Sequence, residues 1–169
     1  MLRFLFGGLM DRQKPAKRLF DRVVAEARQP HWYLEGEVPD TLGGRFAMLA
    51  TLCALAIVRI EAEEDSARRS AAFTERFVEA MDAEHRQMGM NDPALGKRVR
   101  KLVSALARRA AEWRQAIAGE VEWKDAAVSS VYRNEQPSAE AVSYTASALK
   151  EIWHRLEQAT DEELVEGQF

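Results

Sequence analysis

The chain of 169 residues has little cysteine, little proline and little net charge. Its single thiol, Cys53, cannot form an internal disulfide, which excludes a disulfide-stapled fold and suits a reducing compartment. The net charge of −3 creates no global field that would attract DNA or a membrane. The longest uncharged run, residues 46–58, has 13 residues. A helix of that length spans about 20 Å, short of the roughly 30 Å hydrocarbon core, so we interpret it as a buried helix.

Motifs for catalysis and cofactor binding are also missing. The chain has no phosphate-binding glycine loop, no Cys/His zinc spacing and no nucleophile with a recognisable base. Asp82–His85 and Glu151–His154 each place a carboxylate and an imidazole on one helix face, which is half of a di-iron carboxylate site. The apolar stripe around Asp82 favours an outward-facing pair, so we interpret these histidines as solvated or capping. We predict no metal, no cofactor and no enzymatic activity.

Helical periodicity is what the chain does contain. No strand-like alternation extends beyond a few residues, and Pro and Gly divide the chain into helices. We predict an all-α fold, a single-domain irregular bundle of about six helices. The expected helices are residues 15–28, 42–64, one ending at Gly89, one through 95–117, 121–132, and one capped by Ser138, with a loop at 29–40 and at most one turn after Thr160. The expected divisions are an apolar and basic N-terminal tip (1–14), a helical domain (15–160) and an acidic C-terminal tail (161–169).

The helix around residues 46–58 is apolar almost all the way round. Such a helix must be covered on every side, so it is the expected spine of the fold, with Cys53 buried in it. The segment Val38–Gly44, which joins a Pro-led turn to a glycine pair, precedes this helix. We predict that this turn is a shaped binding feature and that Arg45 forms an ion pair with Asp40. The aromatic cluster 31–33 beside it is either a contact surface or a cover over one end of the core.

Positive charge is concentrated in two places. Residues 96–114 contain seven Lys or Arg and one acidic residue. At about 100° per residue, Lys97, Lys101 and Arg108 share a face opposite the apolar stripe of their helix, with Arg98, Arg100 and Arg109 flanking them. This face either binds an anionic partner (lipid headgroups, ribosomal RNA or an acidic loop) or is solvated and paired with acids of the preceding helix. The N-terminal basic residues, beside apolar ones, either suit an anionic membrane surface or belong to a frayed terminus followed by a core helix; they include Arg12, Lys14, Lys17 and Arg18.

Several short stretches together resemble the ubiquinol–cytochrome c chaperone family. These stretches are Val38-Pro39-Asp40-Thr41 with Gly44-Arg45-Phe46 and Met48-Leu49, then Met81-Asp82 with Arg86-Gln87-Met88-Gly89, then Asp92 with Gly96-Lys97-Arg98, and finally Val-Tyr-Arg-Asn at 131–134. The resemblance spans about residues 15 to 158. The chain departs from the family pattern at Ala47, where an acid is expected, near Leu52, and at Leu106-Ala107. The missing polar groups favour a binding module over an enzyme.

The resemblance implies an all-helical, non-catalytic protein that attends newly made cytochrome b during assembly of the cytochrome bc complex. We expect a cytoplasmic protein, peripheral at the inner membrane, with the ribosome exit region and an anionic membrane surface as candidate further partners and no DNA. The residues expected to contact the partner or shape its site are Val38, Pro39, Asp40, Thr41, Gly44, Arg45, Phe46, Met48, Met88, Gly89, Gly96, Lys97 and Arg98. The alternatives are a helical-bundle carrier of a small apolar ligand, a di-iron-type metalloprotein and an RNA-associated module.

Overall fold

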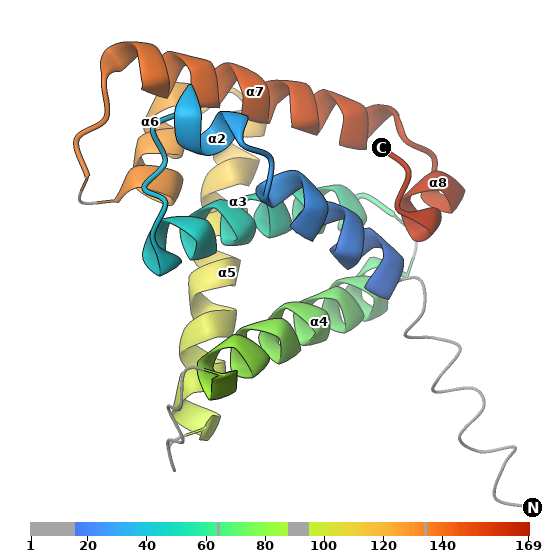
Figure 1. The fold of residues 1–169 in the computed structure, drawn as a ribbon. Coiled ribbons are helices and arrows are strands. Elements are labelled where there is room, and N and C mark those ends of the chain that lie inside the picture. The colour runs from blue at the N-terminus through green and yellow to red at the C-terminus, as the bar shows by residue number, and fades with distance from the viewer. Residues whose placement is uncertain (1–15, 64, 88–94, 134) are drawn as a thin grey trace, which may run out of the picture.

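The computed structural model contains the long helices in the order expected from the sequence (Figure 1). The structure describes residues 16–63, 65–87, 95–133 and 135–169. Every regular element in these ranges is helical, which confirms the predicted all-α fold. Residues 16–27 form the first helical segment. The elements that follow are α2 (His31–Leu34), α3 (Leu42–Ile60), α4 (Ser66–Gln87), α5 (Leu95–Ile117), α6 (Trp123–Ala127), the π-helical turn η1 (Val128–Tyr132), α7 (Ala139–Gln158) and α8 (Asp161–Glu166).

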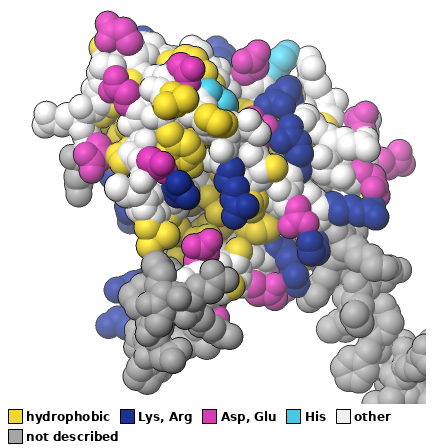
Figure 2. Space-filling view, in the orientation of Figure 1, with side chains coloured by type: hydrophobic (Ala, Val, Ile, Leu, Met, Phe, Trp, Pro, Cys, Tyr) yellow, Lys and Arg dark blue, Asp and Glu magenta, His cyan; other side chains and the backbone are white. Residues whose placement is uncertain are grey.

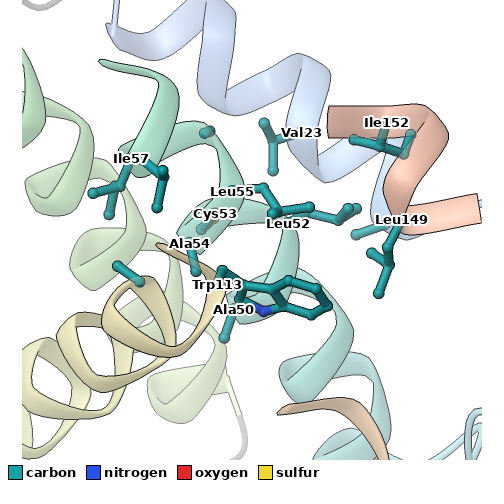
Figure 3. Packing of buried hydrophobic residues seen from close by; sticks show 14 of the residues in the cluster. Val23, Ala50, Leu52, Cys53, Ala54, Leu55, Ile57, Trp113, Leu149 and Ile152 are labelled. Atoms are coloured by element: carbon teal, nitrogen blue, oxygen red, sulfur yellow. The ribbon is translucent and has the colours of Figure 1, made fainter. Parts of the chain in front are cut away.

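Helix α3 is the spine of the fold, as the sequence predicted. It packs against α4, α5, α7 and η1. Figure 3 shows Leu52, Leu55 and Ile57 of α3 among side chains from the neighbouring helices. By length and composition α3 is the one helix of the described ranges that could cross a membrane, but 67% of its most apolar window is buried inside the domain. Cys53 is fully buried, and burial raises the pKa of its thiol far above its usual range, so the thiol is inert.

Two expected segments have a different local structure. The predicted loop 29–40 contains the short helix α2, which begins after Pro30 and buries Trp32 completely. The predicted helix 121–132 splits into α6 and η1. The wider π turn places the consecutive residues Ser130, Val131 and Tyr132 all inside, which the 3.6-residue period does not allow. The helical segment after Thr160 is six residues long, with a full capping box from Thr160 and Glu163.

Three side chains on long helices lie on faces other than those expected. Val103 and Tyr144 fall in step with the apolar positions of α5 and α7, which predicts burial, but they are 38% and 37% exposed. Arg109 was placed beside the basic face of α5, yet it is only 4% exposed. Its guanidinium donates to the carbonyls of Ala105 and Ser130, both at 3.3 Å, so it points into the contact between α5 and η1.

An ion-pair network joins α3 to α4, α7 and α8. The Arg59 guanidinium donates to the carbonyls of Leu156 (3.0 Å) and Ala159 (2.8 Å), which are otherwise unpaired groups at the end of α7. The same guanidinium pairs with Glu63 at 3.0 Å, and Arg69 of α4 pairs with the other oxygen of that carboxylate. The Glu63 side chain is 1% exposed, so its two arginine partners replace all of its hydration.

This network generates a stability prediction. The substitution Glu63→Gln should lower the free energy of unfolding by about 3 kcal/mol, because it leaves two partly buried guanidinium groups without their carboxylate. Urea denaturation followed by circular dichroism measures the change. The control is Glu157→Gln, whose carboxylate is 58% exposed and should matter by less than about 0.5 kcal/mol. Equal effects of the two substitutions would contradict the assigned role of Glu63.

Candidate partner-binding groove

Two helices that touch at one end and separate at the other form a wedge on one face of the molecule. The segment 16–27 and α4 meet where the rings of Phe20 and Phe73 pack edge-on, with centroids 5.8 Å apart. Figure 1 shows the two helices diverging from that end towards the start of α3. The floor of the wedge is therefore the amino-terminal half of α3, which neither helix covers completely.

A groove with a volume of about 820 Å³ occupies this wedge. Its floor is apolar and consists of Phe46 and Leu49 of α3 with Met81 of α4 and Leu102 of α5. At its mouth stand Leu34 and Leu42, which are 72% and 51% exposed, the most exposed large hydrophobic side chains in the described ranges. Figure 2 shows hydrophobic side chains gathered on this face, with acidic and basic side chains around them. Exposed apolar side chains grouped in a concave surface are typical of a binding site.

The turn before α3 sets the shape of the groove. Thr41 caps α3: its hydroxyl oxygen accepts from the Gly44 backbone N–H at 3.2 Å. Gly44 lies so close to Pro39 that a Cβ there would be 1.9 Å from the Pro39 carbonyl oxygen. Only glycine permits this approach, so the segment at Pro39 packs directly against the beginning of α3.

The predicted ion pair between Asp40 and Arg45 is confirmed. Arg45 Nε donates to Asp40 Oδ1 at 2.6 Å, and both side chains are largely exposed at the groove mouth. The hydrogen bond from Arg45 lowers the pKa of the Asp40 carboxyl, so the pair stays ionised well into the acid range. Tyr33 lies nearby and donates its hydroxyl proton to the Ala27 carbonyl at 2.8 Å. Burial is the main reason that the Tyr33 pKa is raised, so this hydroxyl is neutral at physiological pH.

Beneath the floor, Phe46 is held between an aromatic ring and a buried cation. Its ring centroid is 6.0 Å from that of Phe77, and the Arg109 guanidinium carbon lies 5.9 Å from its centroid. Burial lowers the pKa of Arg109 to about 10, and the guanidinium still carries its charge at neutral pH. Arg109 Nε has no hydrogen-bond partner among the described residues. Sequence reasoning missed this residue as a support of the groove, because a basic side chain on a basic helix predicts exposure.

The structure places some of the predicted partner-binding residues close together at the groove. Pro39, Asp40, Thr41, Gly44, Arg45 and Phe46 lie in or beside the groove, whereas Val38 and Met48 are buried and can only shape it. Gly96 and Lys97 are exposed on α5, and Arg98 lies 3.8 Å from Asp82 of α4, which is the pairing that the sequence left open. Met88 and Gly89 lie outside the described residues.

The predicted anionic-surface residues separate into two groups. Lys17 pairs with Asp21 at 2.5 Å and Arg18 pairs with Glu166 of α8, so these two cations are already matched within the chain. Lys101 and Arg108 are exposed on α5, and no ion pair joins them to another described residue. Arg12 and Lys14 lie outside the described residues.

The carboxylate and histidine motifs can be compared with a metal site only over the side chains that the structure describes. In the ranges that the structure describes, no group of three or more His, Cys, Asp or Glu side chains is placed to hold a metal ion. Asp82, expected to face outward, has a side chain only 16% exposed and faces Arg98. His154 is exposed on α7, 2.9 Å from the Gln158 amide nitrogen. The structure does not describe the side chain of His85.

Several groove residues carry no signal in the sequence. Leu34 and Leu42 resemble ordinary core leucines, and Arg28 and Glu84 resemble ordinary surface charges. They become a site only because the segment 16–27, α2, α3 and α4 converge. The one usable signal was the turn at Val38–Gly44, whose Pro and Gly mark a defined backbone shape.

Comparisons with known proteins agree with this architecture. The family described as ubiquinol-cytochrome C chaperone matches residues 35–169. A crystal structure of the Cbp3 homolog from Brucella abortus is similar to this chain with a TM-score of 0.79 and 24% sequence identity, covering 99% of this chain and 94% of that one. At that identity the structural similarity establishes the fold alone. Comparison with curated proteins gives no match.

The two adjacent glycines at the start of α3 provide a matched test of the turn. Gly44→Ala should lower the free energy of unfolding by about 2 kcal/mol or more, because the new methyl group would overlap the Pro39 carbonyl. At Gly43 the nearest atom to a new Cβ is 3.8 Å away, so Gly43→Ala should stabilise the protein by about 0.5 to 1 kcal/mol through helix propensity. Thermal and urea denaturation measure both changes. A well tolerated Gly44→Ala protein would refute the close approach.

Proposed function

Because the chain belongs to the ubiquinol–cytochrome c chaperone family, we propose that it is a non-catalytic assembly chaperone that binds newly made cytochrome b and supports assembly of the cytochrome bc complex. The observation that carries this proposal is the apolar groove between the segment 16–27 and α4, with Leu34 and Leu42 exposed at its mouth. A soluble domain that leaves large hydrophobic side chains uncovered in a concave surface gains free energy when an apolar partner covers them.

The chemistry of the partner matches the chemistry of the groove. Cytochrome b is a multi-span membrane protein, and its apolar segments lack their final neighbours during assembly. An apolar helix lying in a hydrophobic groove is a common mode of recognition. Complete burial of one leucine contributes about 1.5 to 3 kcal/mol. Because Leu34 and Leu42 are 72% and 51% exposed, covering both contributes about 2 to 4 kcal/mol. The other apolar contacts of the groove have to supply the rest of the roughly 8 kcal/mol that a reversible micromolar affinity requires. Such an affinity holds a client and still releases it.

The exposed cations of α5 support a place near an anionic surface. Lys101 and Arg108, with Lys97 one turn away, face solvent without an acidic partner in the described ranges. Each Lys or Arg near an anionic membrane contributes about 1 kcal/mol. The proposed location is therefore cytoplasmic and peripheral at the inner membrane, with the ribosome exit region as a second anionic surface where nascent cytochrome b emerges.

A carrier of a small apolar ligand is the second candidate, and the groove volume favours it. The volume of about 820 Å³ falls within the range of small-molecule sites, about 300 to 1,000 Å³. Native mass spectrometry of the purified protein distinguishes the two functions. A bound quinone or lipid at one molecule per chain would support the carrier and count against a chaperone that keeps its groove free for a polypeptide.

Deletion of the gene tests the chaperone function directly. Membranes of the deletion strain should show a reduced cytochrome b signal of the bc complex in reduced-minus-oxidised spectra, because the unprotected subunit is degraded or misassembled. Re-expression of the wild-type chain should restore the signal. If the spectra of deletion and parent membranes are the same, the chaperone function is wrong.

A substitution at the groove mouth tests the site. Leu42→Asp should reduce copurification of cytochrome b at least about 5-fold, since it puts a charge where the apolar partner docks. The fold should survive, because Leu42 is half exposed in the first turn of α3, where an acidic side chain is favourable.

The matched control is Val103→Asp, which changes an exposed apolar side chain of α5 that does not line the groove. Its copurification should equal that of the wild type, with circular dichroism spectra recorded for all three proteins. Equal loss of copurification in both variants, or no loss in Leu42→Asp, would show that cytochrome b does not bind in the groove.

A further inference from the structure

Two of the four charged side chains that line the groove form no ion pair or side-chain hydrogen bond with another described residue. The charged lining residues are Arg28, Asp40, Arg45 and Glu84. Asp40 and Arg45 neutralise each other at 2.6 Å. Arg28 and Glu84 are exposed, and neither makes an ion pair or side-chain hydrogen bond with any residue in the described ranges. Their charges are therefore available to a ligand.

These two charges are opposite in sign and lie on opposite sides of the groove, one at the end of the segment 16–27 and the other on α4. Arg28 follows the first helical segment and Glu84 lies near the end of α4, and these are the ends that Figure 1 shows farthest apart. The apolar floor of Phe46, Leu49 and Leu102 lies between the arms. The groove thus has one cationic edge, one anionic edge and a hydrophobic floor.

The size of the groove fits a short helix. A helix about 10 Å in diameter occupies about 400 Å³ per turn, so about 820 Å³ corresponds to roughly two turns. A helix that lies on the floor presents one flank to each edge. A fatty acid or an anionic lipid headgroup would use the cationic edge only, so the charge pattern favours a helix over such a ligand.

We propose that the groove selects an apolar helix with an acidic side chain on one flank and a basic side chain on the other, and that Arg28 and Glu84 fix the direction in which this helix lies. The inference rests on the proposed function and specifies the chemistry of its client. A helix with these flanks fits in one direction; turned end for end, its acid would face Glu84 and its base Arg28. Like charges across the groove then disfavour the reversed complex.

The probes are three stapled peptides of about 12 residues, long enough for three turns. They share one Leu/Phe stripe and differ in their flanks: Glu opposite Lys, Glu on both flanks, or Lys on both flanks. Each carries a photoreactive benzoyl-phenylalanine at its amino terminus. Binding is measured by fluorescence anisotropy with the full-length chain at low salt, where exposed charge pairs are least screened.

The wild-type protein should bind the Glu/Lys peptide about 5-fold more tightly than either like-flank peptide, as expected for one exposed attractive pair replaced by a repulsive one. Arg28→Glu makes both edges acidic and should shift the preference to the Lys/Lys peptide. Glu84→Arg makes both edges basic and should shift it to the Glu/Glu peptide. The double variant should again prefer the Glu/Lys peptide, and its crosslink should move to the opposite end of the groove.

Lys150→Glu is the control for net charge, because it alters an exposed cation of α7 that does not line the groove. It should leave the wild-type preference unchanged. A wild-type protein that binds the three peptides equally, a preference that ignores Arg28 and Glu84, or a crosslink that stays in place in the double variant would each overturn the proposal. Binding of oleate that depends on Arg28 and not on Glu84, with no peptide bound, would assign the groove to a lipid and also overturn it.

Failure of this inference is distinguishable from failure of the proposed function. If peptides bind without charge preference and Leu42→Asp abolishes that binding, the groove docks apolar helices but Arg28 and Glu84 do not direct them. If no peptide binds and deletion of the gene leaves the cytochrome b spectrum intact, both are wrong.

Discussion

The apolar surface of α3 is the constraint on which the rest of the structure depends. A helix without a polar face must be covered on all sides, and α4, α5, α7 and η1 provide that cover along most of its length. At its amino-terminal end the cover is incomplete, because the segment 16–27 and α4 diverge from their contact at Phe20 and Phe73. Phe46 and Leu49 are left partly exposed there, so the groove lies where the hydrophobic core is incompletely covered.

Rigid elements hold this uncovered floor in place. Gly44 packs directly against the Pro39 carbonyl, which prevents the turn from moving relative to α3. Arg109 supports Phe46 from below, although its burial leaves one nitrogen without a hydrogen bond. A buried charge with only carbonyl partners is costly, and the well-packed helices around it provide the stability that offsets this cost. A preformed groove of this kind loses little conformational entropy when a partner binds.

Membership of the chaperone family and the shape of the groove point to the same physical task. In the proposed function, a client helix that lacks its final neighbours needs temporary cover, and the groove offers it the exposed side chains of Leu34 and Leu42. The charged side chains of the groove fall into two groups: Asp40 and Arg45 form an ion pair, whereas Arg28 and Glu84 form no ion pair with another described residue. Lys101 and Arg108 of α5 are exposed and do not line the groove.

The sequence by itself determined the long helices and the identity of the spine, because hydrophobic period, Pro, Gly and capping residues act locally. It also located the turn at Val38–Gly44 and the ion pair of Asp40 with Arg45, which are five residues apart. It could not determine that Arg109 is buried, that Tyr144 is exposed or that Ser130 to Tyr132 form a π turn. Those outcomes depend on which distant helix covers each face. For the same reason only the tertiary structure decided that Arg28, Leu34, Leu42 and Glu84 share one groove: the first three lie in consecutive segments that fold back on one another, and long-range packing of α4 brings Glu84 to them.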